Sequence, residues 1–323
     1  MKILSREQFN YNVSSIGGYV DQVGGELLAK ALIGGTTAKH INVRTGIKGT
    51  QALNLLNSQA YFENGTCGWN PSGTTTFSQT YITTCPTKYN EALCYKDLFD
   101  TYQSMLMAPG QTQESVPFEQ QIADLKVKEI QQHIEQQIWQ STTGTSCFNG
   151  FKELISTGQT YVANSSGSTF SASAAYGAAG NPITEVDKLI NVLDDNAQGR
   201  DDLRVFMSFP NYRLYLQALT RANFFSNYIG GAKTIGGADS LLAVHPNTNV
   251  SVIPTLGLSG SNQVTIGPAE FMVMGVDLMS DNEKLKIWYS VDFDELRFRA
   301  NFNYGVAVAS FGSVKYFATN GLS

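Results

Sequence analysis

The sequence contains little charge. Charged residues make up 15% of its 323 residues, while hydrophobic residues, at 42%, are as frequent as in an ordinary globular protein. This charged share is well below the roughly one quarter that is typical of soluble domains. With a net charge of -5, the chain has no basic excess to neutralise a nucleic-acid backbone, which argues against direct DNA recognition. Abundant Thr, Ser, Asn, Gln and Gly instead indicate surfaces that contact other protein surfaces.

Long apolar runs are missing as well. The first residues, MKILSRE, contain no apolar core of signal-peptide length. No later run approaches the roughly 18 apolar residues that are needed to span a bilayer. We therefore expect a protein that is made and kept in the cytosol and that has no membrane partner.

Cysteine is scarce. The four cysteines have neither the CxxC spacing of a zinc or redox site nor the density of a secreted disulfide scaffold. They are Cys67, Cys85, Cys94 and Cys147. Two interpretations stay open: all four are free thiols, or Cys67 and Cys85 bond to each other across a hairpin.

Catalytic signatures are not found in the sequence. None of the three histidines, His40, His133 and His245, has HExxH spacing or the flanking acids of a zinc site. The segment Gly257–Ser261 departs from a nucleophile elbow at its last position, and Gly230–Gly237 places its lysine wrongly for a phosphate loop. We predict no enzymatic activity, no metal and no cofactor.

What the sequence does contain is a long alternation of apolar and polar residues between Asp292 and Phe317. One parity holds Leu296, Phe298, Ala300, Phe302, Tyr304, Val306 and Val308. The other parity holds Arg297, Arg299, Asn301 and Asn303. A strand with this pattern presents an apolar face and a basic, polar face at the same time.

The strongest helix signal covers residues 116–140. Pro117 stands in the expected first turn, and glutamines cover much of the surface outside an apolar stripe. That stripe consists of Phe118, Ile122, Leu125, Val127, Ile130, Ile134 and Ile138. Residues 1–40 carry a weaker amphipathic pattern interrupted by glycine pairs, which we interpret as an arm that folds on a partner surface.

Residues 41–95 are extended and polar, with Phe77 and Tyr81 in phase. Turn residues at Asn64-Gly65 and Gly68–Gly73 are typical of a long hairpin. We find no core in this stretch, and a two-stranded ribbon alone is marginal in water. The sequence therefore predicts that the other surface of the hairpin belongs to an adjacent subunit.

A loop rich in Ser, Ala and Gly at residues 164–180 precedes a compact α/β region. We expect a helix around Val186–Leu193, a buried strand at Leu203–Phe209 and a second helix around Tyr212–Leu219. Short strands follow near Ala243, Val252, Val264, Phe271–Met274 and Leu285–Tyr289.

This order of parts resembles the major capsid protein of tailed bacteriophages, the Hong Kong 97 fold family. Three stretches carry the likeness. They are Phe206–Tyr212, a strand ending in a polar-Pro turn, Trp139–Phe151, a helix end with a glycine turn, and Leu296–Phe317, the closing strands with two outward arginines.

The resemblance implies an α+β fold with named parts. Residues 1–40 are the N-terminal arm and residues 41–95 the extended loop (E-loop). Residues 96–180 and 291–323 form the peripheral domain, with the spine helix at 116–140. Residues 181–290 form the inserted axial α/β domain.

The resemblance also implies a function. The chain is expected to self-assemble into hexamers and pentamers of an icosahedral phage head (Caudovirales-type) that encloses double-stranded DNA, so that its location is the virion after assembly in the host cytoplasm. Expected partners are further copies of itself, with a separate scaffolding protein, portal and head decoration proteins, and packaged DNA bound without specificity.

The subunit interface is expected to use residues of the hairpin region and of the closing strand. These are Arg44, Lys48, Tyr61, Phe62, Trp69, Phe77, Tyr81, Arg297 and Arg299. Two alternatives stay open: an encapsulin-like shell, which protein cargo would distinguish, and a secreted glycan-binding β-protein, which sugar binding by a monomer would distinguish.

Overall fold

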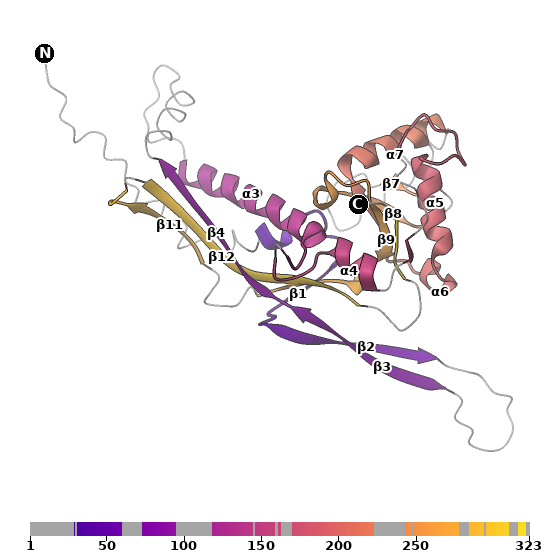
Figure 1. Cartoon of the computed structure of the whole chain (residues 1–323), viewed down its shortest axis with the longest axis horizontal. Coiled ribbons are helices and arrows are strands. Elements are labelled where there is room, and N and C mark those ends of the chain that lie inside the picture. Colours follow the sequence, from indigo (N-terminus) through magenta and orange to yellow (C-terminus); the bar gives the residue numbers. More distant parts are fainter. Residues whose placement is uncertain are drawn as a thin grey trace, which may run out of the picture.

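The structure is a computed structural model of the whole chain. It describes residues 29, 31–59, 73–94, 118–144, 146–158, 161–162, 170–222, 243–246, 248–277, 284–293, 295–309 and 316–320. Figure 1 shows an elongated α+β molecule, with one sheet and a long helix on the left, a second sheet with several helices on the right, and a two-stranded hairpin that projects below the body.

The first sheet is built around one long strand. Its order is β1 (Asn42–Thr45), β10 (Met272–Val276), β12 (Glu295–Val308) and β11 (Lys284–Ser290), and β4 (Cys85–Cys94) also pairs with β12. The predicted alternation is confirmed along β12, because Phe298, Ala300, Phe302, Tyr304 and Val306 are buried while Arg299 is exposed. The strand ends at Val308, earlier than the pattern suggested.

Helix α3 (Phe118–Gln140) packs along this sheet and confirms the predicted helix. Its stripe of Val127, Ile130, Ile134 and Ile138 is buried. The prediction that Leu125 belongs to the same buried stripe is wrong, because this residue is 56% exposed. At 3.6 residues per turn, Leu125 lies on the opposite side of the helix from Ile134.

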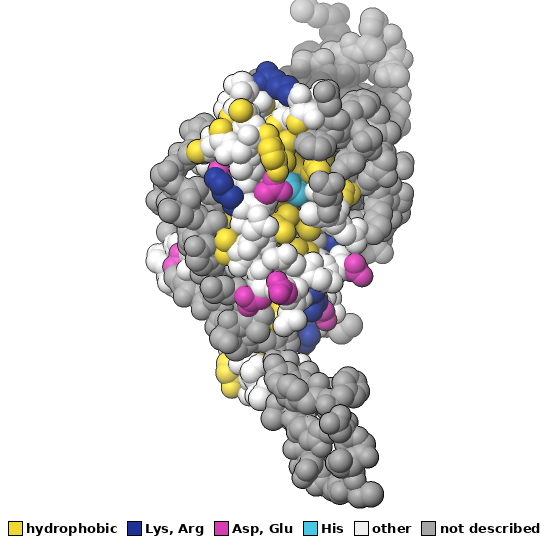
Figure 2. Space-filling view, turned by 90° about the vertical axis from the view of Figure 1, so that its right-hand side faces the viewer, with side chains coloured by type: hydrophobic (Ala, Val, Ile, Leu, Met, Phe, Trp, Pro, Cys, Tyr) yellow, Lys and Arg dark blue, Asp and Glu magenta, His cyan; other side chains and the backbone are white. Residues whose placement is uncertain are grey.

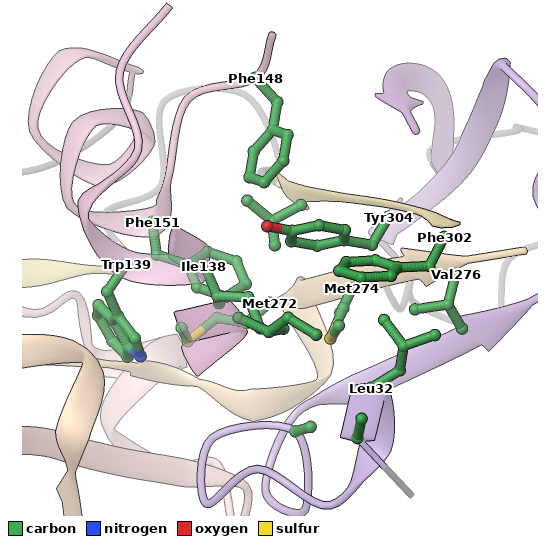
Figure 3. Packing of buried hydrophobic residues seen from close by; sticks show 14 of the residues in the cluster. Leu32, Ile138, Trp139, Phe148, Phe151, Met272, Met274, Val276, Phe302 and Tyr304 are labelled. Atoms are coloured by element: carbon green, nitrogen blue, oxygen red, sulfur yellow. The ribbon is translucent and has the colours of Figure 1, made fainter. Parts of the chain in front are cut away.

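The first core gathers where α3 ends (Figure 3). Trp139 is fully buried. The centre of its ring lies 5.5 Å from the ring centre of Phe151, the first residue of α4 (Phe151–Gly158), and 5.3 Å from that of Phe206. The turn between the two helices passes very close to Trp139, since a Cβ on Gly150 would lie 2.6 Å from the Trp139 carbonyl carbon. The glycine turn noted in the sequence therefore lets α4 fold back on α3.

The second sheet has six strands, ordered β5 (Tyr161–Val162), β13 (Ala318–Asn320), β9 (Val264–Pro268), β6 (Leu203–Ser208), β8 (Ser251–Thr255) and β7 (Ala243–Val244). Helices α5 (Pro182–Val192), α6 (Asp195–Gln198) and α7 (Phe209–Arg221) accompany it. The helices and strands predicted from Val186 onward are confirmed. Asn181 caps α5 by accepting from the backbone N–H groups of Ile183 and Thr184.

Two groups of strands pair differently from the predicted division of the chain. Strands β10 and β11 lie within residues 181–290, yet both pair with β12. Strand β13 lies within residues 291–323, yet it pairs with β9 and β5 of the six-stranded sheet. Such long-range pairing depends on the tertiary structure and leaves no local signal in the sequence.

The cysteine pairing considered from the sequence is wrong. Cys85 is bonded to Cys147, and their Cα atoms are 6.2 Å apart. Cys85 is buried where β4 begins, beside the turn that follows α3, so Cys147 is the thiol within its reach. The bond ties the root of β4 to the end of the long helix; Cys67 lies outside the described residues.

A buried carboxylate joins three segments that are distant in sequence. Glu135 of α3 is 3% exposed, and its Oε1 accepts from the Thr37 N–H at 2.9 Å and from the Thr255 hydroxyl at 2.7 Å. It also accepts from the Thr37 hydroxyl, which in turn accepts from Trp139 Nε1 at 2.8 Å. Glu135 therefore fixes the chain before β1 and the end of β8 to the same turn of α3.

We expect Glu135→Ala to lower the free energy of unfolding by about 2–4 kcal/mol, because buried donors on Thr37 and Thr255 lose their acceptor. Urea denaturation of the purified chain measures this. Gln136→Ala, on the exposed side of the same helix, serves as the control and is expected to change the value by less than about 0.5 kcal/mol. Equal stability of the two variants would contradict the role of Glu135.

Candidate functional site

The hairpin that projects from the body consists of β2 (Thr50–Gln59) and β3 (Thr74–Thr83), paired antiparallel from Thr50↔Thr83 to Gln59↔Thr74. The predicted long hairpin is confirmed in its strands, while its turn lies outside the described residues. Neither strand contains a charged residue or a proline. Natural edge strands normally carry such residues to prevent pairing with other chains, so these edges lack the usual protection.

One face of the hairpin carries large exposed side chains. It carries the cross-strand pairs Leu56↔Phe77 and Ala52↔Tyr81. Leu56 is 58% exposed, Phe77 81% and Tyr81 61%. The hydrogen-bonded pair Asn54↔Gln79 separates the two apolar pairs on this face. We call the four apolar or aromatic side chains the hairpin strip: Ala52, Leu56, Phe77 and Tyr81.

The opposite face of the hairpin is buried at its root. There Leu53 and Ile82 pack with Ile47, Val273 and Ala307 in a small core of their own. This corrects the expectation that residues 41–95 contain no core. Leu53 and Ile82 become neighbours because the strand register pairs Gln51 with Ile82 and Leu53 with Thr80. The sequence alone does not show this register.

Two glycines make room for this root. Gly275 of β10 and Gly305 of β12 are directly paired. A Cβ on Gly305 would lie 2.0 Å from the Thr83 carbonyl oxygen, and a Cβ on Gly275 would lie 2.9 Å from the Ile82 side chain. The chain leaving the hairpin therefore crosses the outer surface of β12 in direct contact with its backbone. The Thr84 hydroxyl donates to the Ile47 carbonyl at 3.1 Å and holds the crossing in place.

The outer face of the five-stranded sheet is basic. Strands β4, β12 and β11 place side by side on it Lys88, Asn301, Arg299, Lys286 and Arg297, with Trp288 opposite Arg297. Lys88, Arg299 and Lys286 are exposed. Arg297 lies 4.8 Å from the Phe293 ring centre and 3.7 Å from Glu295. The basic face predicted for this strand is confirmed.

A second group of exposed apolar side chains lies at the β11–β12 turn. Trp288 is 41% exposed, Phe293 65% and Val291 83%. In Figure 1 this turn lies at the left end of the long axis, opposite the hairpin. The molecule therefore carries uncovered apolar surface at both of its ends.

The predicted interface residues that the structure describes fall into three groups. Arg44 and Lys48 are exposed before the hairpin, and Phe77 and Tyr81 are brought together on its strip. Arg297 and Arg299 lie on the outer sheet face. Tyr61, Phe62 and Trp69 lie outside the described residues. Sequence reasoning missed Leu56, which only the strand register places opposite Phe77.

A chain of hydrogen-bonded polar groups lies between α5, α7 and the segment after β7, and it runs from the exposed Tyr176 through Asp187 to the buried His245 and Tyr215. His245 Nε2 lies 2.7 Å from Asp187, and its Nδ1 lies 2.9 Å from the Tyr215 hydroxyl. Burial would raise the pKa of Asp187, yet hydrogen bonds from His245 and Tyr176 outweigh it and hold the pKa below its usual value. Tyr215 and His245 are buried, so this group of hydrogen bonds joins α5, α7 and the segment after β7.

Among the described residues, no group of three or more His, Cys, Asp or Glu side chains could hold a metal ion. Within the same part of the chain, no helix combines the length and apolar character that crossing a bilayer requires. Seen from the α5 and α7 end, Figure 2 shows acidic and basic side chains dispersed among neutral ones, and the hairpin below them in neutral polar and hydrophobic colours.

Comparison with known proteins gives a consistent answer at the level of structure. No protein-family model and no curated protein matches the sequence. A chain of the satellite phage P4 procapsid, solved including the size determination (Sid) protein, superposes with a TM-score of 0.57 at 11% identity, covering 98% of both chains.

Two further structures agree. A chain from the capsid of the empty GTA particle gives a TM-score of 0.52 at 11% identity over 90% of both chains. A chain of Mycobacterium phage Adephagia gives 0.50 at 11% identity, covering 100% of this chain and 99% of that one. Likeness at such low identity over nearly whole chains establishes the fold: this chain has a phage-capsid fold, as the sequence predicted.

Proposed function

We propose that this chain is the major capsid protein of a tailed phage. Its copies assemble into the hexamers and pentamers of an icosahedral head that encloses double-stranded DNA. The observation that carries the proposal is the hairpin strip, because Leu56, Phe77 and Tyr81 are highly exposed on a ribbon without charge. A ribbon of two strands is marginal in water, so this one is completed by another copy.

The positions of the uncovered surfaces support a head-to-tail contact. The hairpin strip lies at one end of the molecule, and Trp288, Val291 and Phe293 lie at the other. A contact between two different patches is heterologous, and it generates rings when the rotation between copies closes. Hexamers and pentamers are such rings. In this arrangement the contact is bordered by two basic groups. One is Arg44 and Lys48 at the base of the hairpin, and the other is the outer sheet face with Arg297 and Arg299.

The parts of the structure are assigned accordingly. The hairpin β2–β3 acts as the E-loop, and α3 acts as the spine helix of a peripheral domain that contains the five-stranded sheet. The six-stranded sheet with α5, α6 and α7 acts as the axial domain around the ring centre. The chain acts as a structural subunit in the virion, and a scaffolding protein, a portal and decoration proteins are its expected partners.

Electron microscopy of the purified recombinant chain, together with sedimentation at high concentration, tests the proposal. Closed shells of uniform size are the expected result, because each copy offers the same pair of patches. A compact monomer under these conditions would refute it. If shells purified from cells enclose a protein cargo in place of DNA, the chain forms an encapsulin-like compartment and not a phage head.

A further inference from the structure

A cavity of about 290 Å³ lies at the junction of the two sheets. Its walls are Lys39, His40, Ile41 and Asn42 before and within β1, Arg204 of β6, and Ala269 and Glu270 of the short 3-10 helix η4 (Ala269–Phe271). Strand β1 belongs to the five-stranded sheet and β6 to the six-stranded sheet. The helix η4 itself connects β9 of one sheet to β10 of the other, so both halves of the molecule contribute to this cavity.

The cavity brings together three basic side chains. Lys39 is exposed, whereas His40 and Arg204 are partly buried. Arg204 donates from one terminal nitrogen to the carbonyls of Asp201 and Leu203, at 3.0 Å and 2.9 Å. A guanidinium has five N–H donors, and among the described residues Arg204 makes no ion pair. Its remaining donors are thus available to a ligand.

The nearby carboxylates are engaged elsewhere. Arg200 binds Asp202 at 2.7 Å and Glu270 at 2.7 Å, so these two acids are held by a different arginine. Asp201 accepts a hydrogen bond from Asn249 at 3.3 Å. Glu270 lines the cavity itself but is paired with Arg200, and Asp201 and Asp202 act on Arg204 without forming an ion pair with it, so among the described lining residues three basic groups face one paired carboxylate.

The electrostatics of the two partly buried groups agree with this picture. Burial lowers the pKa of His40, and the positive charges of Arg204 and Lys39 lower it further. Burial also lowers the pKa of Arg204, although Asp202 and Asp201 act in the opposite direction. An anion placed in the cavity would favour the charged form of both groups and oppose the downward shift of the two pKa values.

We propose that this cavity binds a phosphate group, held by the Arg204 guanidinium with the Lys39 ammonium and the His40 imidazolium. Arg is suited to a tetrahedral oxyanion because its planar fork donates to two oxygens at once. The phosphate is free or belongs to a nucleic-acid backbone, and the chemistry of recognition is the same. Because the walls come from both sheets, binding also fixes one half of the molecule against the other.

Imidazole NMR tests this inference on the full chain carrying Phe77→Asp, which is expected to stay folded and unassembled because Phe77 is exposed in the single chain. The chain has only three histidines, so His133→Gln and His40→Gln assign the signals. Adding inorganic phosphate, against sodium chloride at matched ionic strength, is expected to raise the His40 pKa in a saturable way. Binding is expected to strengthen as the pH falls through the His40 pKa, since the protonated imidazole donates to the anion.

Variants localise the effect. Arg204→Gln is expected to weaken phosphate binding roughly tenfold or more, since a charge-assisted contact is lost. Lys39→Gln, at an exposed position, gives the same direction of change if Arg204→Gln does not fold. Lys286→Gln removes one positive charge from the outer sheet face and is the matched control. No shift of the His40 pKa, or an equal loss in the control, would overturn the proposal.

A second binding experiment with a short single-stranded oligonucleotide distinguishes the two sources of phosphate. Competition with inorganic phosphate at His40 would identify a backbone phosphate as the source, whereas binding of inorganic phosphate alone would identify a free anion. Both outcomes support the cavity as a phosphate site. Because all readouts use the unassembled chain, their failure is distinct from a failure to form shells.

Discussion

Phe77→Asp is expected to abolish closed shells while leaving the subunit folded. The Phe77 side chain is 81% exposed in the single chain, so the substitution is expected to lower the free energy of unfolding by less than about 1 kcal/mol. If the proposed shell contact holds, the same position is buried against a neighbour, where an unpaired carboxylate costs about 2–4 kcal/mol per contact. Since every copy makes this contact, the loss is repeated around the whole shell.

Sedimentation, electron microscopy and circular dichroism measure the two effects separately. Phe77→Leu is the matched control, because it keeps an apolar side chain opposite Leu56, and it is expected to retain shells. Shells formed equally well by Phe77→Asp would show that the hairpin strip is not a subunit contact. A spectrum typical of an unfolded chain would instead mean that the substitution damages the subunit itself, and Leu56→Asp on the same face would then repeat the test.

Gly305→Ala is expected to lower the stability of the protein strongly. The new Cβ would lie 2.0 Å from the Thr83 carbonyl oxygen and 3.2 Å from the Thr84 Cα. Both neighbours are backbone, so no side-chain rotation can relieve the overlap. Overpacking typically costs about 1–3 kcal/mol and occasionally more, and here it would also displace the root of the hairpin.

Thermal and urea unfolding measure this effect, with Gly144→Ala as the control. A Cβ on Gly144 would have no neighbour within 4 Å, so we expect a change of less than about 0.5 kcal/mol, with a small gain from lower entropy of the unfolded chain. If Gly305→Ala is as stable as this control, the hairpin does not rest on β12 in the way described.

Local periodicity was sufficient to predict several elements. The alternation along Phe298, Phe302 and Val306 identified β12 and its two faces, and the three- and four-residue steps along Ile130, Ile134 and Ile138 identified α3. Both patterns arise from burial of one side of a regular element, so they can be read without knowledge of the partner surface. The phage-capsid fold was predicted from the order of such elements.

The features that were missed depend on contacts between distant residues. The root core joins Ile47, Ile82 and Ala307 across three segments, and no local pattern marks them as neighbours. Glu135 and Lys126 look like ordinary charged helix residues, yet both are buried. Lys126 lies 2.8 Å from Glu91 and 2.9 Å from Glu129. Because polar residues are buried only with partners from elsewhere in the fold, the sequence alone could not place them.

The central claim is that a second copy of this chain covers the hairpin strip. High-resolution electron microscopy of assembled particles tests it most directly, because it shows the surroundings of Leu56, Phe77 and Tyr81 in each subunit. The account predicts that all three side chains are buried against a neighbouring copy. Particles in which these side chains face solvent on every subunit would contradict it.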